Sequence, residues 1–332
     1  MPPSLNPLPE LTNDSILTLT GRVRDQDGTI QSVEYQVNST DNSWTLCQAT
    51  DNTFNQQEES FSCTIENLQD GSHTIYIRAT DNVGNTTQIT TSTSEQTTID
   101  TESPDLDLKS NITLTLNGGS KTNIEENKTF STRKERPTLK GTNKEAKNGI
   151  ITIYQKTFFG SKKRIATISI DKNGKWNYSL PKKENDSRYY AIKLTDQANN
   201  ASDISDWFKV IYDKTPPTFT TTLPETLTAQ RGTRIDFPAT DEQEGLKDQS
   251  GIEKYQVKLI GYHKDWMPTP GKNDPFFIIP EAVPYGTYPL DIKVSDKAGN
   301  HTYHTITLTK QEVKGVETEK KKKIKKRIKN KK

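Results

Sequence analysis

Apolar and polar residues alternate along much of the chain, and three of these alternating segments end in nearly the same phrase. The apolar positions of the three segments are Ile75, Ile77 and Ala79; Tyr190, Ile192 and Leu194; and Leu290, Ile292 and Val294. The phrases that follow are Thr-Asp-Asn-Val-Gly-Asn (80–85), Thr-Asp-Gln-Ala-Asn-Asn (195–200) and Ser-Asp-Lys-Ala-Gly-Asn (295–300). A period of two places one face of a strand in a core and the other in water. The pattern therefore predicts three β-strands that each end in the same kind of turn.

Segments that contain proline separate the repeats. They read Asp-Thr-Glu-Ser-Pro at 100–104 and Asp-Lys-Thr-Pro-Pro at 213–217. Proline lacks a backbone donor and favours extended geometry in the residue before it, so we predict short, stiff joints. Short strands with frequent turn signals are typical of β-sandwiches. We predict an all-β chain with sandwiches at 10–100, 101–214 and 215–310, an N-terminal linker at 1–9 and a basic tail at 311–332.

Several short phrases carry a resemblance to a known family. They are Ala79-Thr80-Asp81 with Gly84-Asn85, the Asp-Lys-Thr-Pro-Pro joint, and the run from Asp171 to Trp176 ahead of Leu180-Pro181. These phrases resemble bacterial Ig-like repeat domains, which are cadherin-like or fibronectin-like sandwiches in secreted and cell-surface proteins. The resemblance implies Ig-like sandwiches outside the cell or on its surface. It specifies a fold rather than a ligand, because this architecture hosts many functions.

The repeated aspartate has two interpretations. In the first it is a structural turn residue whose carboxylate accepts backbone N–H groups. In the second it is a Ca²⁺ ligand that acts together with the joint residues Asp100 and Asp213, by analogy with cadherin-like modules, because calcium prefers several oxygen ligands. Calcium is the only cofactor that this second interpretation implies. The turn residues are Asp81 and Asn85, Asp196 and Asn200, and Asp296 and Asn300.

Both cysteines of the chain, Cys47 and Cys63, fall in the first predicted sandwich. Cys63 is in phase with Phe61 and Ile65 and is expected to face the core, whereas the local pattern does not fix the side of Cys47. A bridge would close a loop of about 16 residues and contribute roughly 3 kcal/mol. An exported chain favours such a bridge. We predict the disulfide, with two buried thiols as the alternative.

The sequence favours a non-catalytic protein. It contains no Cys-x-x-Cys, His-Glu-x-x-His, Gly-x-Ser-x-Gly or phosphate-loop motif. A paired-carboxylate hydrolase needs a deep cleft, which small sandwiches seldom supply. The long irregular segment from Tyr262 to Phe276 contains Trp266, and these three aromatic residues are candidates for stacking on a sugar or a peptide. Packing of Trp266 and Phe276 onto their own sheet is the other interpretation, and we favour it.

Charge changes the picture at the C-terminus. The whole chain has a formal net charge of +2, with 45 Lys and Arg against 43 Asp and Glu. Ten of the basic residues lie in Lys320–Lys332, so residues 1–319 carry a net charge of −8. Ten like charges repel one another and cannot bury a core, so we predict a disordered tail. Its expected partners are anionic cell-wall polymers or a membrane surface, bound in a salt-sensitive way, and no specific nucleic acid is expected. A solvated tail without a fixed partner is the alternative.

These observations predict a secreted or cell-surface stalk or spacer that supports adhesion or display. No apolar run approaches the roughly 20 residues of a membrane-spanning helix, and no export signal is visible in this chain. The first alternative is an adhesin or carbohydrate-binding module that uses the Tyr262–Phe276 segment. The second is the accessory region of a secreted hydrolase. Other surface proteins or glycans are the expected partners of the sandwiches.

Overall fold

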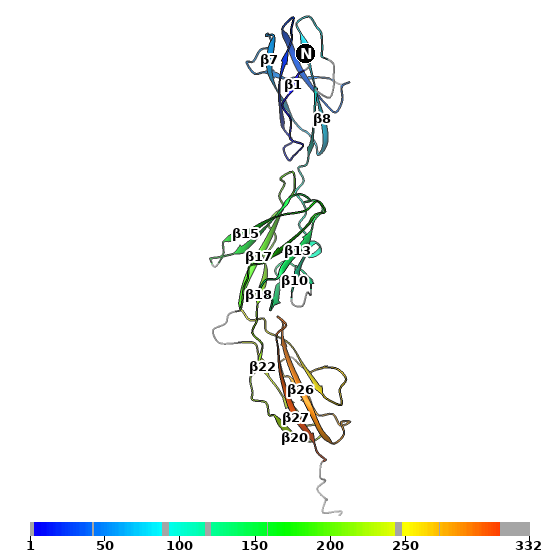
Figure 1. The fold of residues 1–332 in the computed structure, drawn as a ribbon, viewed down its shortest axis with the longest axis vertical. Coiled ribbons are helices and arrows are strands. Elements are labelled where there is room, and N and C mark those ends of the chain that lie inside the picture. Colours follow the sequence, from blue (N-terminus) through cyan, green and yellow to red (C-terminus); the bar gives the residue numbers. More distant parts are fainter. Residues whose placement is uncertain are drawn as a thin grey trace, which may run out of the picture.

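Three groups of β-sheets follow one another along the long axis of the molecule (Figure 1). The computed structural model describes residues 3–41, 43–87, 93–116, 121–157, 159–242, 248–271 and 273–312. Each group of sheets surrounds its own cluster of buried apolar side chains. The predicted all-β fold of tandem sandwiches is confirmed. The predicted disordered tail lies outside the described residues.

Helix is nearly absent from the part of the chain that the structure describes. Its one α-helix is the single turn α1 (Leu108–Asn111), which is capped by the Asp107 carboxylate. Among the described residues, no helix has the length and apolar character needed to cross a membrane.

The first unit contains nine strands in two sheets that enclose one core. The strands are β1 (Ser4–Leu5), β2 (Leu11–Thr12), β3 (Leu17–Arg24), β4 (Ile30–Val37), β5 (Thr45–Leu46), β6 (Gln48–Ala49), β7 (Glu58–Ile65), β8 (Gly71–Asp81) and β9 (Ser94–Ile99). The sheet orders are β1-β3-β7-β6 and β2-β9-β8-β4-β5. Leu19 and Phe61 from one sheet meet Ile75 and Ile77 from the other, so the alternating apolar positions form the layer between the sheets.

The second unit repeats this arrangement with α1 and nine strands. The strands are β10 (Ile112–Thr115), β11 (Lys121–Asn123), β12 (Thr129–Thr132), β13 (Thr138–Thr142), β14 (Ile150–Lys156), β15 (Lys162–Ser169), β16 (Lys175–Ser179), β17 (Asp186–Thr195) and β18 (Phe208–Tyr212). The sheet orders are β11-β10-β13-β16 and β12-β18-β17-β14-β15. Leu139, Trp176, Tyr190 and Phe208 contribute to the core between the two sheets.

The third unit has one large sheet and two short two-stranded sheets. Its strands are β19 (Thr218–Phe219), β20 (Thr226–Ala229), β21 (Arg234–Asp236), β22 (Ala239–Thr240), β23 (Ile252–Leu259), β24 (Met267–Pro268), β25 (Phe276–Ile278), β26 (Gly286–Asp296) and β27 (His301–Lys310). The large sheet has the order β20-β27-β26-β23-β24, and β19-β22 and β21-β25 complete the unit. Phe237, Tyr255 and Leu290 lie in its core.

A glycine that recurs in the sequence has a packing reason. Gly21 on β3 and Gly141 on β13 occupy matching places in the first two units, and each lies beneath an aromatic ring. A Cβ atom would lie 2.7 Å from the Phe61 ring at Gly21 and 2.5 Å from the Trp176 ring at Gly141. Glycine is therefore required for the ring to pack directly on the backbone.

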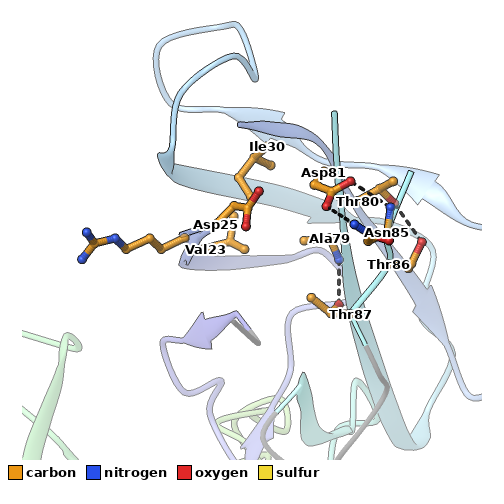
Figure 2. A pocket seen from close by; sticks show the side chains of 10 residues that line it. Val23, Asp25, Ile30, Ala79, Thr80, Asp81, Asn85, Thr86 and Thr87 are labelled. Atoms are coloured by element: carbon orange, nitrogen blue, oxygen red, sulfur yellow. Dashed lines mark hydrogen bonds between the residues drawn. The ribbon is translucent and has the colours of Figure 1, made fainter. Parts of the chain in front are cut away.

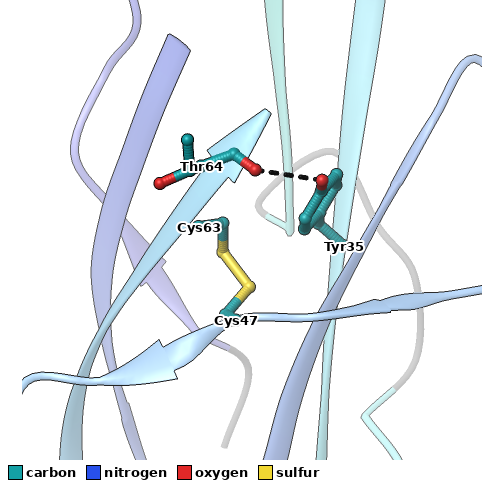
Figure 3. Close-up of a disulfide and its surroundings, with 4 residues drawn as sticks. All are labelled: Tyr35, Cys47, Cys63 and Thr64. Atoms are coloured by element: carbon teal, nitrogen blue, oxygen red, sulfur yellow. Dashed lines mark hydrogen bonds between the residues drawn. A yellow bond between two sulfur atoms is a disulfide. The ribbon is translucent and has the colours of Figure 1, made fainter. Parts of the chain in front are cut away.

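A disulfide joins Cys47 and Cys63 in the first unit, with a Cα–Cα distance of 4.4 Å (Figure 3). Cys63 lies on β7, and Cys47 lies between β5 and β6, where the chain passes from one sheet to the other. The Tyr35 hydroxyl beside the bridge donates to the Thr64 carbonyl at 3.0 Å. The disulfide therefore fixes the point at which the chain passes from one sheet to the other.

Replacing both cysteines by alanine is expected to destabilise the first unit alone, by about 3 kcal/mol, because the unfolded first unit regains the entropy of a 16-residue loop. Hydrogen exchange followed by mass spectrometry, read separately on peptides from the three units, measures the loss. Reduced wild-type protein is the matched control, because it lacks the bond but keeps both side chains. An equal loss of protection in all three units would contradict independent cores.

Candidate metal centre

The repeated phrase forms the same side-chain clasp in all three units. In the first unit, Oδ1 of Asp81 accepts the backbone N–H of Val83 at 2.9 Å and that of Asn85 at 2.8 Å. Oδ2 of Asp81 accepts the Asn85 side-chain amide at 2.7 Å (Figure 2). The matching Asn side chains donate to Asp196 at 3.0 Å and to Asp296 at 2.8 Å. Each aspartate therefore holds the turn that ends its strand.

In the second and third units the clasp also binds the end of the preceding unit. The Asn200 side chain donates to the Asp100 carbonyl at 2.6 Å, and the Asn300 side chain donates to the Asp213 carbonyl at 2.9 Å. The backbone N–H groups of these two joint residues donate to Thr12 and Thr132 of the preceding unit. In these two units the turn formed by the repeated phrase thus contacts the joint that precedes the unit.

The clasp of the first unit is accessible to solvent. Asn85 is exposed and Asp81 is half-buried, whereas Asp296 is fully buried. Asp81 and Asn85 line a pocket of about 280 Å³ together with Asp25, which follows β3 (Figure 2). The same clasp therefore lies in two environments, one wet and one dry.

Three carboxylates meet at the second joint. One oxygen from each of Asp213, Asp241 and Asp296 lies within 4.8 Å of the others, and all three residues are buried. Asp213 and Asp296 are calcium candidates from the sequence, whereas the sequence pattern does not mark Asp241. The structure places Asp241 directly after β22, as it places Asp25 after β3 and Asn143 after β13.

One carboxylate oxygen of this cluster lacks a partner. Oδ2 of Asp241 accepts the Gly251 N–H at 2.6 Å and the Ser250 hydroxyl at 3.2 Å. Oδ1 of Asp241 is buried without a hydrogen-bond partner among the described residues. The Asp213 carboxylate, in contrast, accepts the N–H groups of Thr215 at 3.0 Å and Ser250 at 2.8 Å. A buried, unsatisfied anionic oxygen is costly, so the site favours a proton or a cation.

Burial raises the pKa values of two carboxyl groups in the cluster, those of Asp241 and Asp296. Desolvation raises the pKa of Asp241 to about 7, and the nearby Asp213 charge adds to the increase. Desolvation also raises the pKa of Asp296, against the hydrogen bonds from Asn300. At the exposed clasp, desolvation is outweighed by hydrogen bonds from Asn85 and Val83, which lower the pKa of Asp81. The environment, rather than the clasp itself, decides the direction of the shift.

The three carboxylate oxygens are close enough for one ion to contact all of them. They all lie within 4.8 Å of one another. Ca²⁺ binds oxygen at about 2.3–2.6 Å, so two of its ligands can lie up to about 5 Å apart. The separation of the oxygens is therefore compatible with one calcium ion between them.

The other calcium candidates lie apart from any such group. In the part of the chain that the structure describes, the three joint aspartates are the one group of three potential ligands. Asp100 and Asp196 lie at the first joint, where the residue after β13 is Asn143 and not a third acid. Asp81 shares its pocket with Asp25 alone among the acids.

The aromatic candidates of the third unit are not brought together. The Tyr262 ring lies 5.2 Å from the His263 ring, Trp266 lies 6.2 Å from Tyr303, and Phe276 stacks with Arg234 at 3.9 Å. The segment is also less irregular than expected, because it contains β24 and the start of β25. Each of the three rings has a different partner, and the ligand-binding role of Tyr262, Trp266 and Phe276 stays a prediction.

Comparison with known proteins confirms the resemblance seen in the sequence. Residues 6–77 match the model of a family described as Bacterial Ig domain. No curated protein matches the chain.

Solved structures of tandem domains are similar to the chain over most of its length. The FN1–FN3 domains of chicken CNTN1 share 12% identity with it, covering 93% of this chain and 99% of that one, with a TM-score of 0.38. A tetra-tandem repeat from the extending region of a large adhesion protein shares 17% identity, covering 93% and 73%, with a TM-score of 0.27. These low TM-scores say nothing about the ligands or partners of this chain.

Without divalent cations, the third unit is expected to lose thermal stability as the pH rises from about 5 to 8. Asp241 has a folded pKa of about 7, above its ordinary 3.8, so the proton favours the folded state and its contribution is lost as the pH rises through 7. Desolvation lowers the pKa values of His263 and His301, which act in the opposite direction in this range.

The difference between the wild type and Asp241→Asn isolates the carboxyl group. We expect the variant to melt at a higher temperature than the wild type at pH 8 in chelator, and the gap to shrink towards pH 5. Asp265→Asn, at an exposed loop position of the same unit, is the matched control. Parallel pH profiles for the wild type and Asp241→Asn would refute this assignment.

Proposed function

We propose that this protein is a non-catalytic stalk or spacer on a bacterial cell surface. Its first unit matches a bacterial Ig domain, and two further β-sandwiches follow in line (Figure 1). The observation that carries the proposal is the hydrogen-bonded contact at both joints. Units that only needed to be tethered would require no such contacts, because a flexible linker suffices. A spacer requires them, because it must transmit its orientation from one unit to the next.

The first joint is hydrogen-bonded on both sides. Thr101 donates to the Asp70 carboxylate of the first unit through its N–H at 3.0 Å and its hydroxyl at 2.8 Å. Asp105 donates its N–H to Glu145 at 2.8 Å and accepts the Asn143 side chain at 2.6 Å. Together with the Asn200 contact to Asp100, these bonds leave little freedom between the first two units.

The second joint has further contacts across the units. The Lys209 ammonium of the second unit pairs with Asp248 at 3.0 Å, and the Ser187 hydroxyl donates to the same carboxylate at 2.5 Å. Within the third unit, Thr302 donates to the carbonyl of the joint residue Pro217. Consecutive prolines at 216 and 217 restrict the backbone of this joint in addition.

We also propose that a calcium ion binds at the second joint. Asp213 belongs to the joint, whereas Asp241 and Asp296 belong to the third unit, so one ion between them would link the joint to that unit. The ion would also neutralise the unpartnered Asp241 oxygen. Extracellular calcium sites bind with Kd values of about 10⁻⁴ to 10⁻³ M, which suits a site with three protein carboxylates.

The disulfide supports a location outside the cytoplasm. Disulfides persist in oxidising environments and are rare in the cytosol. The buried bridge between Cys47 and Cys63 is therefore consistent with a secreted or surface-exposed chain.

Asn300→Ala is expected to loosen the second joint, because it removes a buried inter-unit hydrogen bond worth about 1 kcal/mol. Small-angle scattering measures the effect. The wild type should behave as a rod with a radius of gyration near 30 Å, against about 20 Å for a compact globule of this length. The variant should show a broader distribution of shapes.

The first unit provides the control for this experiment. Asn85→Ala removes the same clasp, but Asn85 donates its side-chain amide to Asp81 alone among the described residues, away from both joints. It should leave the scattering curve unchanged. A compact wild-type particle, or equal effects of the two substitutions, would refute the spacer proposal.

Calcium titration provides a separate test. Calorimetry on the full chain should detect one site in the submillimolar to millimolar range, and calcium should raise the melting temperature of the third unit. Asp241→Asn should abolish both effects, whereas Asp265→Asn should retain them. Calcium binding that survives Asp241→Asn would place the ion elsewhere.

A further inference from the structure

The net charge of the body hides an uneven distribution among the units. Residues 10–100 contain 3 Lys and Arg against 14 Asp and Glu, a net charge of −11. Residues 101–214 contain 21 basic against 14 acidic residues, a net charge of +7. The body is therefore not uniformly acidic, because a basic unit follows an acidic one.

Part of the positive charge of the second unit lies on one face of its larger sheet. The apolar positions Ile151, Ile153, Tyr190 and Phe208 point into the core. Because side chains alternate along strands, the residues between them point outwards. The pairing register sets Lys162 beside Lys156, Arg164 beside Tyr154, Tyr154 beside Ala191, and Tyr189 beside Lys209. Continued by one residue, the same register sets Lys156 beside Tyr189 and Ala191 beside Trp207. The outward residues therefore form two rows across the sheet: Lys162, Lys156, Tyr189 and Lys209 in one, and Arg164, Tyr154, Ala191 and Trp207 in the other.

Aromatic rings alternate with the ammonium groups on this face. Lys156 Nζ lies 5.6 Å from the centre of the Tyr189 ring and 5.9 Å from that of Trp207. Lys209 Nζ lies 5.6 Å from Tyr189, and Lys162 Nζ lies 5.7 Å from Tyr154. Such cation–π contacts hold the ammonium groups against a flat aromatic surface. We call this surface the basic face.

The basic face has few acids to neutralise it. Strands β14, β15 and β18 contain no Asp or Glu, and Asp186 at the start of β17 pairs with Arg188. Asp248 pairs with Lys209, but no ion pair joins Lys156, Lys162 or Arg164 to an acid within the described residues. Lysines on the edge strand β15 alone would serve to block edge-to-edge pairing. Lys156 and Tyr189 lie on interior strands, where that purpose does not apply.

We propose that the basic face of the second unit binds an acidic polysaccharide. Adjacent strands lie about 4.8 Å apart, so the four-residue row spans roughly 14 Å, a length that accommodates a few sugar rings. The carboxylate or sulfate groups of the polymer pair with Lys156, Lys162 and Arg164. The pyranose rings pack on the exposed aromatic surfaces, of which Tyr189 is 41% exposed.

The choice of polysaccharide over nucleic acid rests on the extracellular location in the proposed function. The chemistry of the face agrees with it, because the partly exposed rings offer stacking surfaces to the C–H groups of sugar rings. Binding would hold the middle of the spacer against an anionic matrix. Lys209 also takes part in the second joint. Lys156, Lys162, Arg164 and Tyr189 do not appear in the joint contacts described above, so binding at these residues can fail while the rod survives, and the reverse.

The test measures binding of the full chain to heparin and to polygalacturonate, with dextran as the uncharged polymer, by biolayer interferometry at 50 and 300 mM NaCl. The triple variant Lys156→Gln, Lys162→Gln, Arg164→Gln is compared with Lys140→Gln, Lys172→Gln, Lys175→Gln, which removes the same charge from exposed positions outside the basic face. Both triples are also made in a chain that ends at residue 319, so that the tail contributes nothing.

The basic-face triple is expected to weaken binding at 50 mM NaCl on the order of 100-fold, since each lysine or arginine near an anionic surface contributes about fivefold. The control triple should weaken it less than about fivefold. Tyr189→Ala should lower the affinity roughly fivefold with an unchanged salt dependence, and Tyr189→Phe should restore it.

Three results would overturn the proposal. Equal losses from the two triples would mean that only net charge matters. If the chain that ends at residue 319 binds neither acidic polymer, an acidic polysaccharide is ruled out as the ligand of the basic face. Tighter binding of single-stranded DNA, with competition at the same residues, would assign the face to nucleic acid instead.

Discussion

The structure depends on one hydrogen-bonded clasp, in which an aspartate at the end of a strand holds the asparagine four residues later. Carboxylate acceptance of the backbone N–H and side-chain amide fixes the turn in every unit. The asparagine amide has a second N–H, and in the later units it donates to the carbonyl at which the preceding unit ends. One side chain thus both closes its own turn and positions the neighbouring unit.

The surroundings of the clasp decide its chemistry. In the first unit water reaches Asp81, and hydrogen bonds keep its pKa low. At the second joint the preceding unit excludes water, and two further carboxylates approach Asp296. Confining like charges in a dry site raises the pKa of Asp241 to about 7 and creates a place for a proton or a cation. At the first joint Asn143 replaces the third acid, so a repeated architecture yields two different joints.

The units also differ in the role that their surfaces can play. Their cores follow the same alternation, so the outward positions are free to vary without changing the fold. The first unit uses this freedom for acids, and the second for lysines that are interleaved with aromatic rings. The proposed spacer and the proposed polysaccharide-binding face therefore coexist on one scaffold, because one depends on the joints and the other on a sheet surface.

The sequence by itself determined the all-β class and the tandem repetition, because alternation and turn signals are local properties. It offered the turn role of Asp81 as one of two interpretations. It also marked Asp213 and Asp296, which recur at fixed places in their phrases. Only the tertiary structure added Asp241 to them, since a short strand far from both in sequence carries it to the joint. The basic face likewise required strand pairing, because Lys156, Lys162 and Tyr189 become neighbours through the sheet register. Local pattern fixes which face of a strand is buried, whereas the proximity of charges depends on contacts between distant segments.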